Sequence, residues 1–352
     1  MLSRLQSSRS ERRWRPVSGM LAVAAIWACA VLPAMSAETV SSAVVLMYHR
    51  FGEDNAPSTN IRIKQFEEHI VELRSGNYNV VPLAEIVAAL AEHRQLPPRT
   101  VAITIDDAHR SIYEEAWPRL RGAGLPFTVF VSTNPVDRRL PGYLSWEQLR
   151  QLAASDTTIA NHTMSHLHMT AANDATNAAE IEGAHRRIIE EIGNAPPLFA
   201  YPYGEYSNRT IELVKAAGLT AALGQQSGVA HELGDPFQMP RFALNETYGD
   251  IGRFRLVVNS LPLPVHEVTP NDTLLDGNNP PPFGFTVDQR IAEIDRLDCF
   301  ASNGRTMIER LGERRFEVRI PKPFASRRGR FNCTVPTRDG RFRWFGIQFV
   351  IP

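Results

Sequence analysis

The chain has no excess of charge of either sign, because its 352 residues carry 38 basic and 38 acidic side chains. Nucleic-acid-binding proteins usually show a basic patch or stripe, and the absence of such an excess excludes that class of partner. Cysteine is scarce as well, with three residues in the whole chain. No apolar run is long and uninterrupted enough for a transmembrane helix, which needs about 20 residues.

The first 37 residues have the pattern of a secretory signal peptide. Five arginines precede an apolar run over residues 20–31, and small residues follow at 34, 36 and 37. Removal of this segment leaves 33 basic and 37 acidic side chains, a net charge of about −4. We therefore expect an exported protein, periplasmic or extracellular, without a membrane span once the signal is removed. A twin-arginine signal at Arg12-Arg13 and a retained membrane anchor are the alternatives.

Two of the three cysteines, Cys299 and Cys333, lie outside the predicted signal peptide. An even number of cysteines in an oxidising compartment favours a disulfide bond. Such a bond would lie within the C-terminal region of the chain.

Short apolar runs alternate with amphipathic stretches of helical periodicity from residue 44 to residue 223. This alternation predicts a parallel sheet with helices between its strands. Seven strand–helix units fit this length. Both a barrel with its active site at the strand ends and an open doubly wound sheet agree with the pattern. The predicted strands are residues 44–48, 79–81, 101–105, 127–131, 157–160, 198–201 and 220–223, and the predicted helices are residues 64–75, 83–93, 111–123, 145–154, 175–192 and 207–217.

A proline-rich, turn-forming segment follows residue 261 and marks a change of character. Beyond it, we expect one helix at residues 287–297 and strands at 315–320 and 341–351. The predicted organisation is therefore a signal peptide, an α/β domain and a small β-rich C-terminal domain, which cover residues 1–37, 38–261 and 262–352.

The polar residues with the clearest chemistry follow two of the predicted strands. Asp106 and Asp107 end one apolar run, and His162 and His166 follow a later one. On a helical turn, residues four apart share a face with about 5–6 Å between their Cβ atoms. Two imidazoles at this spacing can bind one zinc ion at about 2.0–2.1 Å. We expect one carboxylate to be the third ligand, which leaves a position for water, and the other to accept a proton.

A third polar motif, Ala200-Tyr201-Pro202-Tyr203-Gly204, again follows an apolar stretch. Taken alone, an Asp-Asp pair after a strand is usually a turn or a helix N-cap, and two histidines at this spacing are usually surface or core residues. Three such motifs at strand ends of one chain favour a shared pocket.

The three motifs together resemble those of the polysaccharide deacetylase family, the NodB-homology carbohydrate esterases. Thr104–Asp107 is similar to the family's T-F-D-D motif, His162–His166 to H-[ST]-x-x-H, and residues 200–204 to R-x-P-Y-G. The resemblance extends over about residues 44–245. It implies a distorted (β/α)₇ barrel and an enzyme that removes N-acetyl or O-acetyl groups from glycans with a divalent metal, commonly zinc.

Carried over residue by residue, the resemblance makes Asp107, His162 and His166 the metal ligands, with Zn²⁺ the expected ion. It makes Asp106 the catalytic base. Ala108 stands where the family often has glycine, a small change that should leave the pocket open.

Two further departures require substitutes from elsewhere in the chain. Ala200 replaces the arginine that orients the base, and Arg241 is our candidate for its role. The late L-x-H motif that supplies the general acid is not evident. His49 directly follows the first predicted strand, as the histidine of the L-x-H motif follows a strand. It would reach the same end of the barrel if the order of the strand–helix units is permuted. His266 is the rival candidate.

The resemblance predicts a metal-dependent hydrolase of carbon–nitrogen bonds other than peptide bonds. It would remove N-acetyl groups from an N-acetylhexosamine-containing polysaccharide. A metal-activated water would attack the acetamide carbonyl, with Asp106 as base, His49 as acid and the Tyr203 backbone N–H as an oxyanion donor. The alternatives are an O-acetyl polysaccharide esterase and a non-catalytic glycan-binding envelope protein. The sequence does not identify the glycan, the native metal or the oligomeric state, and a monomer is compatible with it.

The other histidines are interpreted as bystanders. His69, His168 and His185 have no motif around them and are expected to be ordinary surface residues.

Overall fold

The computed structural model describes residues 11–12, 40–155 and 157–352. The predicted signal peptide lies outside these residues except for 11–12, so it stays a prediction. Residues 39–352 form one compact unit. Within the described residues, none of the helices combines the length and the apolar character that a membrane crossing requires.

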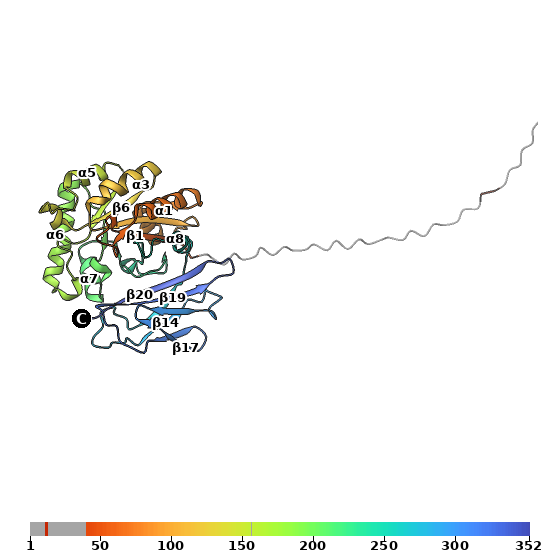
Figure 1. Ribbon diagram of the computed structural model, residues 1–352. Helices are drawn as coiled ribbons and strands as arrows, with labels where there is room; N and C mark the ends of the chain where they lie inside the picture. The colour runs from red at the N-terminus through yellow and green to blue at the C-terminus, as the bar shows by residue number, and fades with distance from the viewer. Residues whose placement is uncertain (1–10, 13–39, 156) are drawn as a thin grey trace, which may run out of the picture. The chain divides into compact units, whose positions relative to one another are not determined.

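Seven parallel strands form the barrel of this unit (Figure 1). Each neighbouring pair from β1 to β9 is parallel, and β11 pairs with β1 on its other side. Met239, which precedes β11, bridges Leu223 at the end of β9 and so closes the ring. The predicted distorted (β/α)₇ barrel is confirmed. Its strands in order are β1 (Ser42–Tyr48), β5 (Thr100–Asp106), β6 (Phe127–Val131), β7 (Thr158–Asn161), β8 (Leu198–Ala200), β9 (Ala221–Leu223) and β11 (Phe242–Ala243).

Six of the seven predicted strands belong to the ring, but the seventh ring strand is a different one. The predicted strand at 79–81 is the short β4 (Asn79–Val80), which pairs only with the first two residues of β5. The ring is completed instead by β11, whose two residues are too few to show an apolar alternation.

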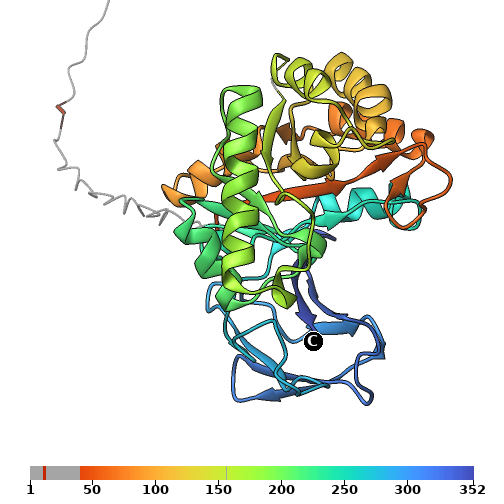
Figure 2. The same cartoon turned by 90° about the vertical axis from the view of Figure 1, so that its left-hand side faces the viewer.

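Helices cover the outside of the barrel, as the two side views show (Figure 2). The helix predicted at 145–154 begins with a capping box, in which Ser145 and Gln148 exchange side-chain and backbone hydrogen bonds, as expected for such a pair. The helices are α1 (Ile63–Ser75), α2 (Leu83–Ala91), α3 (Trp117–Ala123, after a π-helical turn at Ile112–Ala116), α4 (Thr133–Asp137), α5 (Trp146–Ala153), α6 (Asp174–Ile192), α7 (Asn208–Ala216) and α8 (Ile251–Val258).

His69 is not the surface residue that we expected. It lies three positions after Phe66 on α1, so it shares the inner face of this helix and is fully buried. Its Nε2–H donates to the carbonyl of Gly249 (2.9 Å), and its Nδ1 accepts the hydroxyl proton of Tyr48 (3.0 Å). This histidine therefore connects α1 with β1 and the loop before α8.

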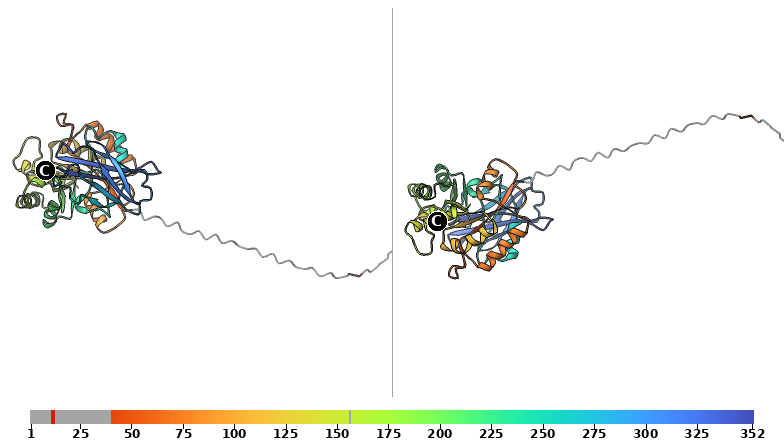
Figure 3. Two further views of the ribbon diagram at one scale, coloured as in Figure 1. Left: turned by 90° about the horizontal axis from the view of Figure 1, so that it is seen from below. Right: turned by 90° about the horizontal axis from the view of Figure 1, so that it is seen from above.

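The C-terminal region consists of two small sheets with a hydrophobic core of their own, which includes Phe283, Phe331 and Phe349. In the view from below, its blue strands face the reader (Figure 3). The predicted domain boundary at residue 261 stays a prediction. One sheet has the order β12 (Leu261–Pro262), β20 (Phe342–Val350), β19 (Arg328–Pro336), β15 (Asp298–Ala301) and β16 (Gly304–Arg305); the other has the order β13 (Val265–Thr269), β14 (Phe283–Val287), β18 (Arg315–Arg319) and β17 (Met307–Leu311).

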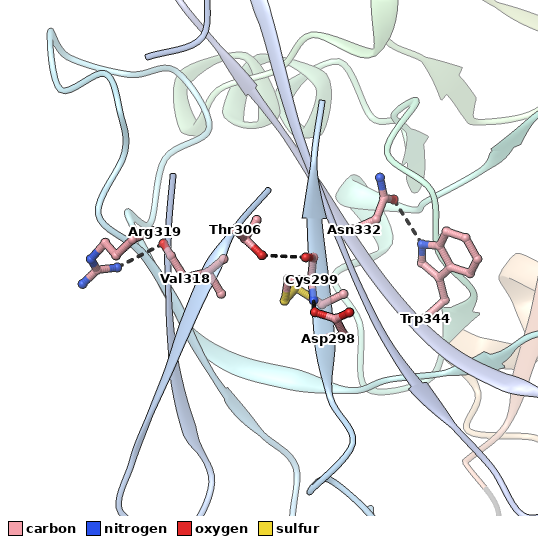
Figure 4. Close-up of a disulfide and its surroundings, with 8 residues drawn as sticks. Asp298, Cys299, Thr306, Val318, Arg319, Asn332 and Trp344 are labelled. Carbon is pink, nitrogen blue, oxygen red and sulfur yellow. Dashed lines mark hydrogen bonds between the residues drawn. A yellow bond between two sulfur atoms is a disulfide. The ribbon is translucent and has the colours of Figure 1, made fainter. Parts of the chain in front are cut away.

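The predicted disulfide is present between Cys299 of β15 and Cys333 of β19, with an S–S distance of 2.01 Å. The two residues are direct partners in the antiparallel ladder. The hydroxyl of Thr306 donates to the carbonyl of Cys299, beside the sulfur bridge (Figure 4). The disulfide therefore stabilises one sheet of the C-terminal region and lies outside the barrel.

The helix predicted at residues 287–297 is wrong. Val287 ends β14, and the chain then makes two separate turns. The guanidinium of Arg314 donates to the carbonyls of Val287, Asp288 and Ile291. These carbonyls are the acceptors that a helix at this position needs, so their use by Arg314 favours the turns.

Candidate active site

Asp106 and Asp107 lie where β5 ends, and their backbones differ. Asp106 is the last residue of the strand and is fully buried. Asp107 has a φ of 78°, in the left-handed region that few residues other than glycine adopt. The turn at Asp107 sends the two carboxylates to different partners.

The His162–His166 segment is a loop after β7, so the helical turn that we expected is wrong. Left-handed backbone at Thr163 (φ 66°) and His166 (φ 58°) folds the segment back on itself. Glu180 of α6 holds its tip, because one carboxylate oxygen accepts two successive backbone N–H groups at 2.9 and 2.7 Å. Loop geometry and a buried carboxylate, rather than helical periodicity, bring the two imidazoles together.

Three side chains converge on one point. Oδ1 of Asp107 lies 3.4 Å from Nε2 of His162 and 3.3 Å from Nε2 of His166, and the ligand atoms of all three lie within 4.8 Å of one another. Nδ1–H of His162 donates to the carbonyl of Ala200 (2.7 Å), so in the neutral imidazole Nε2 presents a lone pair. Such a backbone partner is typical of metal-bound histidine.

Asp107, His162 and His166 have the donor atoms that a bound cation requires. Asp107 Oδ1 and His162 Nε2 are both buried without a hydrogen-bond partner. Two lone pairs that face each other are unfavourable unless a proton or a metal ion lies between them, because buried polar atoms need partners. Two imidazoles and one carboxylate are also a donor set that catalytic zinc uses, with a position left for water.

The local field favours one positive charge in the cluster, at His162 rather than at His166. Burial alone would lower the pKa of His162, but the carboxylates of Asp107 and Asp106 raise it above its ordinary value. Burial, together with the charge of His162, lowers the pKa of His166 to about 4. Burial alone would raise the pKa of Asp107, yet the neighbouring imidazoles of His109 and His162 hold it well below its usual range.

Arg241 makes a bidentate ion pair with Asp106. Its Nη1 and Nη2 donate to Oδ1 (2.7 Å) and Oδ2 (2.8 Å), and both side chains are fully buried. Nε donates to the carbonyl of Gly224 (2.9 Å), which fixes the plane of the guanidinium. Burial would raise the pKa of Asp106, but the charges of Arg241, His162 and His49 together outweigh it, and the pKa lies below its ordinary value. Arg241 lies next to β11, so its side chain enters the barrel from the closing strand.

The two candidate acids lie in different places. Nε2 of His49, directly after β1, is 3.9 Å from Oδ2 of Asp106. Burial lowers the pKa of His49 despite the opposing effect of Asp107 and Asp106. His266 lies in β13 of the C-terminal region, where it is exposed and pairs with Thr286. The structure therefore brings His49, and not His266, to the strand ends of the barrel.

Tyr203 borders the cluster with its ring. It lies in the turn after β8 with a φ of 59°, and its ring meets that of His166 edge-on at 4.4 Å. On its other side the ring stacks on His168 at 4.0 Å. The N–H groups of Gly204 and Glu205 donate within the same turn.

His109 is a residue of this site that sequence reasoning missed. Its ring is buried, and Nε2 lies 3.3 Å from Oδ2 of Asp107, the oxygen that faces away from the other two imidazoles. It also pairs through the backbone with Tyr143. Its position in the sequence could have identified it, because a histidine two residues after Asp107 lies within the same turn. Its hydrogen bond leaves Oδ1 of Asp107 to face His162 and His166.

Residues 93–222 match the family model described as polysaccharide deacetylase. This part of the chain is similar to polysaccharide deacetylase domains. The match includes Asp106, Asp107 and the His162–His166 loop. It ends before Arg241 and begins after His49, so these two residues lie outside the part of the deacetylase domain that the model covers.

Curated relatives of the deacetylase domain cover part of the chain. A putative polysaccharide deacetylase, YxkH of Bacillus subtilis, is 24% identical over 186 residues, which are 53% of this chain and 65% of that protein. The chain thus spans slightly less than two thirds of this relative. The poly-beta-1,6-N-acetyl-D-glucosamine N-deacetylase of Staphylococcus aureus is 22% identical over 232 residues, 58% of this chain and 80% of that protein.

Solved structures show the same fold. The deacetylase PplD of Streptococcus pyogenes matches with a TM-score of 0.58 and 17% identity, over 62% of this chain and 99% of that one. IcaB of Ammonifex degensii matches with a TM-score of 0.57 and 24% identity, over 63% and 98% of the two chains. These similarities support the barrel assignment.

Replacement of Arg241 should destabilise the protein strongly. The Arg241→Gln variant leaves the Asp106 carboxylate buried without its partner, and breaking a buried pair in this way costs about 3–5 kcal/mol. Arg255→Gln is the matched control, because Arg255 pairs with Glu72 while 60% exposed, and surface pairs contribute about 0–1 kcal/mol. Urea denaturation of both variants measures the difference, and equal losses would contradict the importance of the buried pair.

Proposed function

We propose that this protein removes N-acetyl groups from a polysaccharide that contains N-acetylhexosamine. The observation that carries the proposal is the place of Asp106. This buried, ionised carboxylate is held by Arg241 beside Asp107, His162 and His166, and it does not belong to that group of possible metal ligands. A purely structural metal site has no use for such a residue. The matched relative from Staphylococcus aureus, which is named for N-deacetylation of a glucosamine polymer, supports the choice of bond.

We assign Asp107, His162 and His166 as the ligands of a divalent cation, and Zn²⁺ as that ion. Their donor set and their unpaired buried atoms support the assignment. A cation at this point supplies Lewis acidity, which polarises an acetyl carbonyl and makes water acidic enough to lose a proton near neutral pH.

Asp106 is the base in this proposal. Because Arg241 keeps its pKa low, Asp106 is ionised at neutral pH and can accept a proton from the attacking water. The two Arg241 hydrogen bonds leave further lone pairs on the carboxylate oxygens and fix their direction. Arg241 therefore acts as a positioning residue, in the role that the family gives to the arginine that Ala200 replaces.

The backbone N–H of Tyr203 is the donor that we assign to the oxyanion. A donor aimed at the developing negative charge stabilises the transition state more than the ground state, and loss of one such donor typically costs about 2.7–4 kcal/mol. The left-handed backbone and the ring contacts with His166 and His168 hold Tyr203 beside the cluster.

His49 is the acid in this proposal. Burial lowers its pKa, so it is largely neutral before the reaction and must gain a proton during it. Asp106, 3.9 Å away, has just taken a proton from water and can supply it. His49 then donates the proton to the leaving nitrogen as the carbon–nitrogen bond breaks, which releases acetate and a free amine.

Acetate release tests the proposed function. We expect acetate from N-acetylglucosamine oligomers, none after treatment with a chelator, and recovery when Zn²⁺ is added back. O-acetylated xylan is the comparison substrate. Release from xylan alone would replace the proposal with the O-acetyl esterase. Binding of glycans without release from either substrate would favour the non-catalytic glycan-binding protein.

Substitutions at the two aspartates should separate catalysis from metal binding. Asp106→Asn keeps the side-chain shape and removes the base, so we expect near-normal zinc content with turnover reduced by a factor of about 10²–10⁴. Asp107→Ala and His162→Ala should lose zinc and turnover together. Zinc content from elemental analysis and the rate of acetate release are measured on the same samples. Normal turnover in Asp106→Asn would refute the base assignment.

His49→Ala and His266→Ala distinguish the two candidate acids. We expect His49→Ala to reduce the rate at saturating substrate by a factor of about 10²–10⁴, because it removes the proton donor to the amine. His266→Ala should behave like the unmodified protein, since this side chain is exposed on β13. The reverse order of the two rates would move the acid to the C-terminal region.

A further inference from the structure

A buried glutamine of the C-terminal region holds the turn that carries Tyr203. Nε2 of Gln348, in β20, donates to the carbonyls of Tyr203 (3.1 Å) and Gly204 (3.0 Å), and its side chain is fully buried. Its Oε1 accepts from Nε of Arg330 (2.8 Å). A guanidinium has donors only, so the amide oxygen must face Arg330 and the amide nitrogen must face the turn. The orientation of Gln348 is therefore determined by its neighbours.

The turn needs such support because its backbone is strained. Tyr203 and Gly204 both have left-handed φ values, 59° and 66°. This conformation is uncommon for a bulky residue, and it persists only where the surroundings impose it. Arg328, at the start of β19, adds a further hydrogen bond to the Tyr203 carbonyl (3.4 Å).

A second attachment reaches the turn through Glu205. Its side chain is fully buried, and Oε2 accepts hydrogen bonds from His168 (2.8 Å) and from Arg327 of the C-terminal region (3.1 Å). The His168 ring is the one that stacks on Tyr203. Gln348, Arg328 and Arg327 of the C-terminal region therefore all act on Tyr203, either at its carbonyl or through Glu205 and His168 at its ring.

We propose that Gln348 is a positioning residue that sets the direction of the Tyr203 N–H. The C-terminal region thereby contributes to the geometry of the active site. This inference rests on the proposed function, because there the Tyr203 N–H faces the oxyanion. The carbonyl and the N–H of one residue are related by its two backbone dihedral angles. Fixing the carbonyl and the ring therefore fixes the N–H. Misplacement of a catalytic group by about 1 Å can cost a factor of about 10² in rate.

The test compares Gln348→Met with Val335→Ala. Met keeps the approximate size of the side chain and removes its donors. Val335 belongs to the hydrophobic core of the same region and takes no part in the hydrogen bonds between Gln348 and the turn, so Val335→Ala reports loss of stability alone. For Gln348→Met we expect kcat to fall by a factor of about 10–100, with KM for the N-acetylated oligomer and zinc content close to the unmodified protein. Val335→Ala should lower the melting temperature and keep kcat.

Amide hydrogen exchange provides a readout that does not depend on activity. We expect faster exchange of the peptide that contains residues 201–206 in Gln348→Met, and unchanged exchange there in Val335→Ala. A kcat within a factor of two of the unmodified protein, or an equal fall in both variants, would overturn the inference. If the unmodified protein releases no acetate, the proposed function fails, and unchanged exchange of residues 201–206 in Gln348→Met would still overturn the role of Gln348 separately.

Discussion

The buried ion pair between Asp106 and Arg241 is the interaction on which the site depends. Removal of two charges from water is costly, and an ion pair compensates only when its geometry is good and its remaining donors are satisfied. Here two parallel hydrogen bonds and the Gly224 carbonyl meet that requirement. Arg241 also directly precedes β11, the strand that pairs with β1, so the same interaction fixes the proposed base and ties the last strand to the barrel.

Backbone strain recurs in the turns that surround the site. Asp107, Thr163, His166 and Tyr203 all have left-handed φ values without being glycine. Each such residue costs on the order of 1–3 kcal/mol and persists only in surroundings that impose it. The constraints come from buried polar groups, such as Glu180 under the histidine loop. Loops that would otherwise relax are therefore held in the geometry that converges on Asp107.

The sequence predicted what depends on local pattern and missed what depends on long-range pairing. Apolar alternation located six strands of the ring, but the two-residue β11 has no pattern and is defined only by its partners. The helix at 287–297 failed because Arg314, distant in sequence, takes its carbonyls. The spacing of His162 and His166 pointed to a common ligand although the helical turn assumed for it is absent. His109 was overlooked, despite its place two residues after Asp107.

The charges of the site favour binding of a cation, and they stabilise a negatively charged transition state more than the neutral substrate. Arg241 compensates the negative charge of Asp106, which leaves the charge of Asp107 among imidazoles. The raised pKa of His162 is the response of the protein to that charge, since a proton there would neutralise it. A divalent ion in place of the proton would make the net charge +1. A hydroxide or an oxyanion would then restore neutrality, so the arrangement would favour the negatively charged species of the proposed amide hydrolysis over the neutral amide.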